Sequence, residues 1–502
     1  MSTRVETGSG AVLGQEDAGV RSWLGIPYAA PPWGELRFAA PQPVAPWGAP
    51  REAFSCGPPA PQVIPLPGSA IQPSTDETPD CLTLNIWAPS DPAEPSPVMV
   101  WLHGGAFMAG TGGDNAYAGT ALAREGAVVV TINYRLGVDG FGQIDGAVSN
   151  RGLLDQIAAL EWVRENIAGF GGDPQRVTVF GESAGAASIL ALLSMPRARG
   201  LLHRAIMQSI PNSFVMPDLA RSVTDAVAAA AGVTADADSL ASLSPQELAA
   251  ATRVALGQLR GRADWGRVSA SPSPFGPVVD ADTLPEDPWS ALRDGAANEV
   301  PVILGHNRDE YRVFLMGQQR LGKITAEEAD DAVRALSPLG DADGYRALMP
   351  DADPNELFEK VYSDWLVLAP TMHAAEAALE GGGDVFVYEL CLDPVGGIGS
   401  PHAIDLPLTF DTFEYGTGML IPQPTEAERE TGARLRRAWV KFAAEGNPGW
   451  TPWSSERAVQ IWGGDDAVVP YPERDRLDFS MTEPSRAFDL VREPAAASSS
   501  AE

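Results

Sequence analysis

The stretch RVTVFGESAGAASILALL, residues 176–193, decides the fold of this chain. RVTVF at 176–180 predicts a buried strand, and AASILALL at 186–193 predicts a helix that follows it almost at once. Between them, GESAG at 181–185 has the pattern G-x-S-x-G, which is typical of a tight turn that lifts the hydroxyl of its serine, Ser183, above a sheet edge. The glycines let neighbouring backbone approach without a Cβ clash, and the helix start supplies positive potential for an oxyanion. An ordinary strand-to-helix turn is the alternative interpretation.

Further apolar runs flank this turn on both sides. VMVWLH at 98–103 and AVVVTIN at 127–133 precede it, and VPVIL at 300–304 and VFVYEL at 385–390 follow it. Between them, residues 153–167 carry apolar side chains at helical spacing. Strands that are apolar on both faces and alternate with helices predict an α/β fold with one large, mostly parallel central sheet covered by helices.

The rest of the chain predicts one domain with insertions. Residues 217–259 are rich in Ala, Leu and acidic side chains and predict helices outside the sheet. We therefore expect residues 1–490 to form a single catalytic domain, with helical insertions at about 211–270 and 312–380 that form a cap or gorge. The Pro- and Gly-rich residues 57–75 predict a surface loop, and the small polar residues 491–502 predict a disordered tail.

The chain is strongly acidic: Asp and Glu total 66 and Lys and Arg total 35, a net charge of −31. Such a surface repels phosphate backbones and anionic lipid, so we expect neither a nucleic-acid partner nor a membrane partner. The beginning of the sequence has no apolar leader, and no run approaches about 18 apolar residues. We expect a cytoplasmic protein that is a monomer or a weak homodimer.

A second glycine-rich motif, HGGAF at 103–107, follows the apolar run at 98–102 directly. Acyl transfer requires backbone N–H groups aimed at the oxyanion that develops in the transition state. A glycine pair after a strand supplies such N–H groups with no side chain in the way. Gly104 and Gly105, together with the N–H of Ala184, are therefore the candidates for an oxyanion hole, and a loop that serves only to turn the chain is the alternative.

A serine nucleophile needs a base at neutral pH, and the chain has five histidines to choose from. His103 belongs to the glycine loop, His203 leads into an apolar run, and His373 lies on an alanine-rich helix. His402 lies in the loop GIGSPHAIDLP after the run at 385–390, late in the chain, which fits the order serine, acid, histidine of α/β-hydrolases. His402 is the main candidate, and His306 is the alternative.

The acid of a triad should follow a middle strand and precede the histidine in the chain. Asp309 and Glu310 come soon after the run at 300–304 and fit this position, while Asp280 and Asp405 are rivals. Neighbouring side chains in an extended stretch point to opposite sides, so only one of Asp309 and Glu310 should face the histidine. Its task would be to hold the imidazole tautomer and to stabilise the imidazolium.

Over residues 10 to 455 the chain resembles the type-B carboxylesterase family, which includes bacterial para-nitrobenzyl esterases and animal cholinesterases. Many ordered motifs carry this resemblance, and they are GIPYAAPP at 25–32, LRF at 36–38, DCLTLNI at 80–86, HGGAF at 103–107, NYRLG at 133–137, NRGLLDQ at 150–156, FGGDP at 170–174, GESAG at 181–185, FGPVVD at 275–280 and DE at 309–310.

The resemblance implies an α/β-hydrolase fold and assigns roles to individual residues. It implies Glu310 rather than Asp309 as the acid, and His402 as the base within a His-x-x-Asp segment that ends at Asp405. The oxyanion donors that it implies are Gly104, Gly105 and Ala184. The supporting residues that it implies near the site are Glu182, Ser209 and Asp405.

The chain departs from the family pattern at three places. Tyr311 stands where a glycine usually follows the acid, and Ile210 stands where a glycine usually follows the Gln-Ser pair. The first bridge cysteine of the family would fall near residue 60, whereas this chain has Cys56. A Cys56–Cys81 disulfide and free thiols are therefore both open, and Cys391 has no further cysteine to pair with.

Together these features predict a serine carboxylesterase that hydrolyses small-molecule esters through an acyl-enzyme on Ser183, with no metal and no organic cofactor. A non-catalytic binding protein on the same fold and an amidase or carbamate hydrolase with the same triad are the alternatives. A nucleotide enzyme is discarded, because HGGAF is not G-x-G-x-x-G and no P-loop motif occurs. The candidates for an apolar lining of the gorge are Trp33, Trp101, Phe107, Phe275, Met316 and Phe410.

Overall fold

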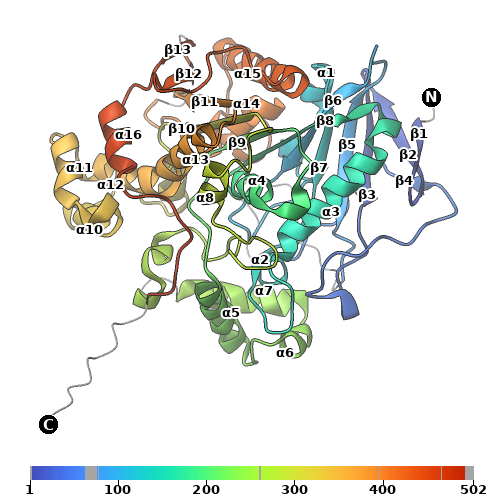
Figure 1. Ribbon diagram of the computed structural model, residues 1–502, viewed down its shortest axis with the longest axis horizontal. Coiled ribbons are helices and arrows are strands. Elements are labelled where there is room, and N and C mark those ends of the chain that lie inside the picture. Colours follow the sequence, from blue (N-terminus) through green and yellow to red (C-terminus); the bar gives the residue numbers. More distant parts are fainter. Residues whose placement is uncertain are drawn as a thin grey trace.

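In the computed structural model, a single large sheet runs through the molecule, with helices packed on both of its faces (Figure 1). The structure describes residues 3–62, 76, 78–258, 262–394, 396–464 and 466–491. Most of the loop expected at 57–75, and the expected tail from residue 492 on, lie outside these residues.

Within the described chain the sheet has 13 strands, in the order β1-β2-β3-β5-β7-β6-β8-β9-β10-β11-β12-β13, and β4 pairs with β2. The pairs from β7 to β12 are parallel, whereas those from β1 to β7 along this order, and the pair β12–β13, are antiparallel. The strands are β1 Thr3–Thr7, β2 Gly10–Asp17, β3 Val20–Pro27, β4 Arg51–Glu52, β5 Thr83–Pro89, β6 Ser96–Leu102, β7 Val128–Ile132, β8 Gly172–Glu182, β9 Arg204–Gln208, β10 Val302–Asn307, β11 Val385–Leu390, β12 Ala458–Trp462 and β13 Ala467–Pro470.

Helices fill most of the connections between these strands. The α-helices are α1 Thr120–Arg124, α2 Gly137–Phe141, α3 Arg151–Asn166, α4 Ala184–Ser194, α5 Pro217–Ala231, α6 Ala237–Ala241, α7 Pro245–Gly257, α8 Pro288–Arg293, α9 Arg312–Gly317, α10 Ala326–Leu336, α11 Ala342–Leu348, α12 Pro354–Ser363, α13 Ala369–Glu380, α14 Asp405–Phe410, α15 Glu426–Glu445 and α16 Arg474–Ser480. The short 3-10 helices are η1 Gly34–Leu36, η2 Asn115–Tyr117, η3 Ile167–Phe170, η4 Pro196–Ala198, η5 Ala263–Ala270, η6 Pro338–Gly340 and η8 Gly416–Leu420, and η7 Asp364–Leu368 is a π-helix.

The central strands are apolar on both faces because each face carries its own core. Along β6, Val98, Val100 and Leu102 join the core under α3, α4, α8 and α13, whereas Met99 and Trp101 join the core under α1, α14 and α15. This alternation is that of a strand whose successive side chains point to opposite sides. The prediction of a mostly parallel sheet covered by helices is confirmed.

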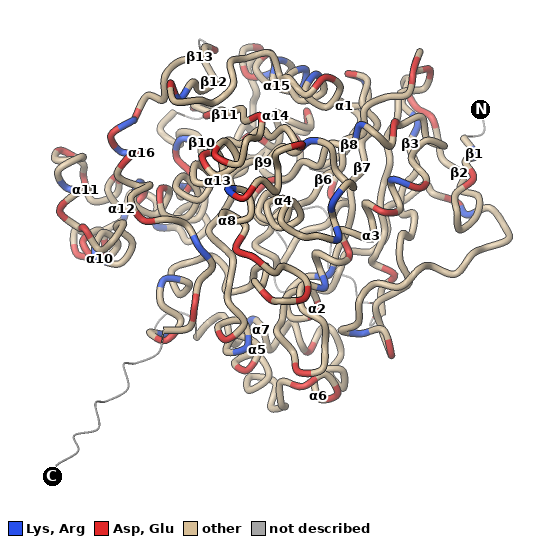
Figure 2. Tube along the Cα trace, in the orientation of Figure 1, with Lys and Arg blue, Asp and Glu red and all other residues tan. Residues whose placement is uncertain are grey.

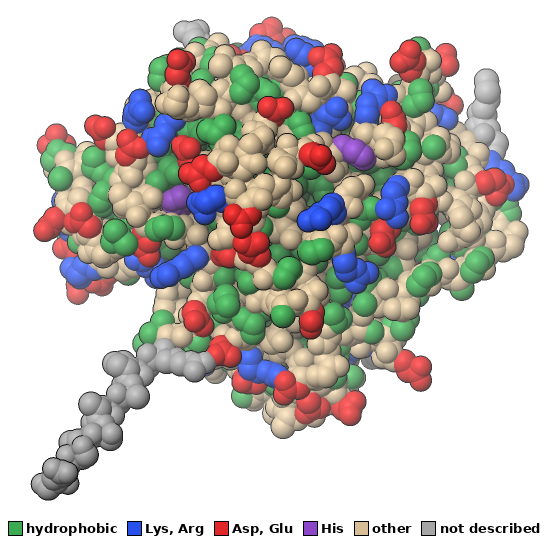
Figure 3. All heavy atoms as spheres, viewed as in Figure 1, with side chains coloured by type: hydrophobic (Ala, Val, Ile, Leu, Met, Phe, Trp, Pro, Cys, Tyr) green, Lys and Arg blue, Asp and Glu red, His purple; other side chains and the backbone are tan. Residues whose placement is uncertain are grey.

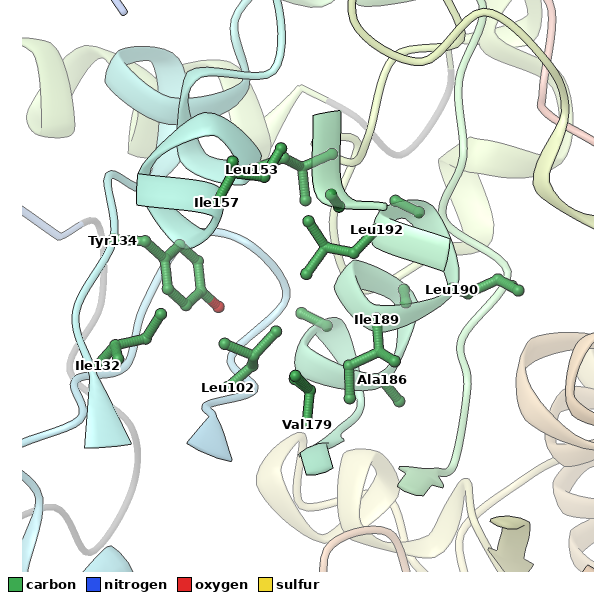
Figure 4. Packing of buried hydrophobic residues seen from close by; sticks show 14 of the residues in the cluster. Leu102, Ile132, Tyr134, Leu153, Ile157, Val179, Ala186, Ile189, Leu190 and Leu192 are labelled. Carbon is green, nitrogen blue, oxygen red and sulfur yellow. The ribbon is translucent and has the colours of Figure 1, made fainter. Parts of the chain in front are cut away.

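Figure 4 shows the first of these cores at the point where β6, β7 and β8 end. Side chains from α3 and α4 meet those from the strand ends, among them Leu153, Ile157, Ala186, Ile189, Leu102 and Val179. All of these side chains are buried, so the helix that carries the G-x-S-x-G serine at its N-terminus sits on a closely packed base.

Helices of the region 312–380 build a lobe with a hydrophobic cluster of its own. Leu315, Val333, Leu336, Tyr345 and Trp365 belong to this cluster. It draws residues from α9, α10, α11, α12 and η7, and α10 to α12 lie at one end of the molecule (Figure 1). Helix α13, by contrast, packs on β10 and β11 as part of the layer that covers the sheet. Helices α5 to α7 form a second group beside α2.

Acidic residues are spread over the whole chain trace and are dense on α10 to α12 and around α6 (Figure 2). On the face shown in Figure 3 they alternate with basic and apolar side chains. None of the helices in the described residues combines the length and the apolar character that a membrane crossing requires.

Candidate active site

The serine of the G-x-S-x-G motif lies between β8 and α4, in the middle of the sheet (Figure 1). Ser183 has φ 55° and ψ −123°, a strained conformation for a residue with a Cβ. The backbone of this turn packs closely against the end of β6. A Cβ at Gly185 would lie 1.9 Å from the carbonyl oxygen of Leu102. Ser183 donates its N–H to the carbonyl of Gln208 at 2.9 Å, and it is half-buried while both of its neighbours are buried. The turn thereby places Ser183 at the carboxyl end of β8.

The glycine loop that follows β6 packs against this turn. A Cβ on Gly104 would lie 2.7 Å from Glu182 Oε2 and 3.2 Å from Ser183 Cβ, so only glycine permits this approach. Gly105 has φ 113°, and a Cβ there would lie 2.1 Å from the carbonyl oxygen of Ala109. Ala184 is the first residue of α4, where backbone N–H groups have no acceptor within the helix. Gly104 and Ala184 thus lie beside Ser183, and Gly105 follows Gly104 in the same loop.

His103 stabilises the glycine loop. Its Nδ1 donates to the carbonyl of Gly104 at 2.8 Å, and its ring stacks on Tyr134 at a centroid distance of 4.4 Å. Burial lowers the pKa of His103 to about 4, although the bond to Gly104 opposes this shift. The ring is therefore neutral at neutral pH and holds the loop without adding charge to the site.

His402 and Glu310 meet at the carboxyl ends of β10 and β11. His402 Nδ1 lies 2.5 Å from Glu310 Oε2, and both side chains are buried. The other carboxylate oxygen of Glu310 accepts the hydroxyl of Ser209 at 2.6 Å and the N–H of Asn307 at 2.7 Å. The carboxylate is therefore held by three donors, and the histidine ring is oriented by it.

The far side of the histidine ring faces a second carboxylate. His402 Nε2 lies 2.9 Å from Glu182 Oε1, an ion-pair contact without the alignment of a hydrogen bond. Burial lowers the pKa of His402, but the charges of Glu182 and Glu310 outweigh burial and hold that pKa well above its ordinary value. The ring of Phe314 lies 5.4 Å away, between centroids, and covers the imidazole from α9.

Glu182→Gln is expected to move the acid limb of the pH profile of kcat/KM to lower pH. A protonated imidazole cannot accept a proton from Ser183, so activity falls as the pH falls through the pKa of His402. The substitution removes one of the two charges that raise this pKa, which then drops. Ester hydrolysis followed from acid to neutral pH tests this, with Glu389→Gln, a buried carboxylate on β11, as the control. An acid limb that stays in place or moves to higher pH contradicts it.

Asp405 forms hydrogen bonds with Gln208 and Tyr388. Its Oδ2 accepts Gln208 Nε2 at 2.6 Å and the hydroxyl of Tyr388 at 3.1 Å. Burial, with Glu182 as the next cause, raises the pKa of Asp405 to about 6. Because the carbonyl of Gln208 accepts the N–H of Ser183, this contact ties Asp405 to the nucleophile turn.

The rival histidines and acids are engaged elsewhere. His306 lies between the carbonyl of Asn307 and the hydroxyl of Tyr471. Asp309 binds Lys360 at 3.0 Å and the N–H of Ser400 at 2.9 Å. The others have local partners: His203 accepts the N–H of Val177, His373 contacts Ser485 and Met481, and Asp280 accepts Thr283.

Three contributors to the site were not found in the sequence: Gln208, Phe314 and Tyr388. Gln208 directly precedes Ser209 in the chain, which is a weak signal, whereas Phe314 and Tyr388 carry none. Of the expected gorge residues, Trp101 and Phe410 pack against each other in the core at 5.0 Å. The other four are half-buried or buried side chains, with Trp33 and Met316 in the first group and Phe107 and Phe275 in the second.

All three cysteines are free thiols, so Cys56 and Cys81 form no disulfide. Burial raises the pKa of Cys56 to about 11 and that of Cys391 to about 12, and it raises the pKa of Cys81 as well. Thiols with such pKa values are poor nucleophiles at neutral pH. The three thiols are therefore mostly protonated at neutral pH.

Comparison with known proteins identifies the family. The chain matches the Carboxylesterase family over residues 1–462. It is 36% identical over 498 residues to the para-nitrobenzyl esterase of Bacillus subtilis, covering 94% of this chain and 97% of that protein. It is 33% identical to the phenmedipham hydrolase of Pseudarthrobacter oxydans, covering 88% and 90%.

Solved structures agree with the sequence matches. A para-nitrobenzyl esterase structure superposes with a TM-score of 0.81 at 33% identity, covering 94% of this chain and 99% of that chain. A Geobacillus stearothermophilus carboxylesterase gives a TM-score of 0.82 at 34% identity, covering 95% and 100%. The chain belongs to the type-B carboxylesterase family and is a carboxylic-ester hydrolase with the α/β-hydrolase fold.

Proposed function

We propose that this esterase works through an acyl-enzyme on Ser183, with His402 as general base and Glu310 as the acid that orients it. Gly104, Gly105 and Ala184 donate their N–H groups to the oxyanion. Glu182, Ser209 and Asp405 position these groups. The observation that carries the proposal is the 2.5 Å contact of His402 with Glu310, on the same side of the sheet as the strained turn of Ser183.

The first step forms the acyl-enzyme. As Ser183 Oγ attacks the ester carbonyl carbon, its proton passes to Nε2 of His402, and the carbonyl oxygen becomes an oxyanion held by backbone N–H groups. The bond to the alcohol oxygen then breaks, and His402 returns the proton to the leaving alkoxide. Glu310 stabilises the imidazolium throughout, because its carboxylate stays on Nδ1.

The second step returns the enzyme to its starting state. A water molecule gives one proton to His402 and attacks the acyl carbon, which regenerates the oxyanion. When this intermediate collapses, Ser183 Oγ leaves and takes the proton back from His402. The products are the free carboxylic acid and the alcohol, and each proton is accounted for by the one imidazole.

A covalent trap tests the assignment of the nucleophile. An alkyl phosphonate ester with a para-nitrophenol leaving group should release one nitrophenol per chain and add one phosphonyl group, and proteolysis with mass spectrometry should locate it on the peptide that contains Ser183. Pretreatment with a slow ester substrate should delay the labelling. The proposal is contradicted if the phosphonyl group is found on another residue. It is also contradicted if the protein hydrolyses esters but takes up no phosphonyl group.

We further propose that residues 1–490 act as one catalytic domain, with cap-like insertions at about 211–270 and 312–380. The separate hydrophobic cluster of the lobe from α9 to η7 supports the second insertion. We propose a cytoplasmic location and a monomer or weak homodimer. The three free thiols support a reducing compartment.

A further inference from the structure

A cavity of about 640 Å³ lies away from the catalytic group, between η5, η7 and the segment 481–491 that follows α16. Its lining includes neither Ser183 nor His402 nor any residue of the glycine loop. Figure 1 shows the red segment that forms one of its walls running down from α16 toward α5. Its volume falls in the range of cavities that hold small-molecule ligands, roughly 300–1,000 Å³.

The walls are held in place, so the cavity exists before any ligand arrives. Backbone hydrogen bonds attach the segment to the rest of the protein: Met216 donates to Phe488, Phe488 donates to Phe214, and Val491 donates to Asp264. A further bond, from the N–H of Ala487 to Asp287, anchors it from the side. A preformed cavity binds a ligand without the cost of ordering its walls.

Apolar atoms make up the larger part of the lining, and several aromatic rings contribute to it. Met216, Trp265, Tyr345, Trp365 and Phe488 contribute to it. These five side chains come from four parts of the sequence that lie far apart, before α5, in η5, in α11 and η7, and after α16, so only the folded chain brings them together. Such a lining favours a ligand with a large apolar surface.

The charges that are not exposed in the lining are paired within the protein, whereas Arg486 and Asp489 lie on its exposed part. Arg267 pairs with Glu483 at 2.9 Å, and Asp364 is paired with the guanidinium of Arg476. Asp364 also accepts the hydroxyl of Tyr345 at 3.0 Å. An ion brought into this space would meet no free counter-charge in its interior and would lose its hydration, so a neutral ligand is favoured.

Two polar groups in the lining have no partner among the described residues. Asn212 Oδ1, an acceptor, and Trp365 Nε1, a donor, are both unpaired, and their residues are 8% and 6% exposed. Buried polar groups are nearly always paired, so these two atoms indicate where a ligand would form hydrogen bonds with the protein. They match a neutral molecule that carries a carbonyl, hydroxyl or amide beside its apolar body.

A short loop lies between this cavity and the residues around His402. Ser209, which donates to Glu310, and Asn212, which lines the cavity, stand at the two ends of one short loop. Asn212 donates its N–H to the carbonyl of Leu366 at 2.8 Å, and Ile210 donates its N–H to Thr371 at 3.1 Å. These bonds attach the loop to η7 and α13, and neither Ser183 nor His402 belongs to the lining of the cavity.

We propose that this cavity is a second ligand site, distinct from the catalytic centre, that takes a neutral and largely apolar small molecule with one uncharged hydrogen-bonding group. The site does not depend on the roles proposed for Ser183 and His402.

Fluorescence titration of the full chain with N-phenyl-1-naphthylamine, a neutral apolar amine that fluoresces in apolar surroundings, tests the site. We expect saturable binding with one probe per chain. Ala369→Leu and Ala487→Leu place extra side-chain atoms into the lining from two different walls, and each should weaken binding by about tenfold or more. Ala230→Leu, an exposed position on α5, is the matched control and should bind as the wild type does.

The same titration on the phosphonylated protein separates this cavity from the catalytic pocket. We expect unchanged affinity when Ser183 carries the phosphonyl group, whose mass shift is read independently of probe binding. Loss of binding on phosphonylation, binding that never saturates, or cavity variants that fold and bind as tightly as the wild type would each overturn the proposal.

Discussion

Ser183→Ala is expected to lower kcat/KM for para-nitrophenyl acetate and butyrate by at least about 10³-fold. The alanine variant has no oxygen to attack the ester, so the acyl-enzyme cannot form. The backbone N–H groups of Gly104, Gly105 and Ala184 remain in place, which leaves weak stabilisation of an oxyanion formed by water. Initial rates at matched protein concentration, with the fold checked by circular dichroism, give the measurement.

Ser194→Ala is the control on the same helix. The hydroxyl of Ser194 donates to the carbonyl of Leu190 at the far end of α4, away from the turn, so its loss should leave the rates unchanged. If Ser183→Ala retains the activity of the wild type, Ser183 is not the nucleophile. If both serine variants lose activity alike, the effect comes from the helix and not from the hydroxyl.

Glu310→Gln is expected to lower kcat by roughly 10³- to 10⁴-fold while the protein still folds. The amide is nearly isosteric with the carboxylate but carries no charge to stabilise the imidazolium. Its amide N–H can also donate to Nδ1 of His402, which favours the wrong tautomer, the one with the proton on Nε2. The donors from Ser209 and Asn307 lose their charged acceptor, so the orientation of the side chain weakens as well.

Asp309→Asn provides a neighbouring control for the same charge change. Asp309 binds Lys360 and Ser400 instead of the histidine. Burial would raise the pKa of Asp309, but Lys360 and the other partners outweigh burial and lower that pKa. We expect a lower unfolding midpoint in urea for this variant and a kcat close to that of the wild type. A large loss of kcat in Asp309→Asn with little loss in Glu310→Gln would reverse the assignment of the acid.

The two neighbouring acids show how far local reasoning reaches. The rule that side chains alternate in an extended stretch required that only one of Asp309 and Glu310 face the histidine, but it did not say which one. The family resemblance implied Glu310. In the structure the distinction depends on partners remote in sequence, because Lys360 on α12 and Ser400 in a later loop bind Asp309, and Ser209 after β9 binds Glu310.

The glycines illustrate the opposite case, where sequence reasoning was sufficient. Gly104 and Gly185 were expected to allow close backbone approach, and the nearest atoms to a hypothetical Cβ at these positions lie within 2.7 Å. These close contacts join two loops that follow neighbouring strands of the sheet. The short glycine motifs are therefore enough to predict them.

By itself, the sequence determined the fold class and the set of candidate groups, because strand and helix periodicity and the glycine motifs are local properties of the chain. The family followed from the resemblance of many ordered motifs along the sequence. Only the tertiary structure decided that Glu182 contacts the free nitrogen of His402, that Phe314 covers its ring, and that a second cavity exists. These features join residues separated by tens to hundreds of positions, as with Met216 and Phe488 in one cavity wall. Their distances depend on how whole layers pack, and no local pattern in the chain records that packing.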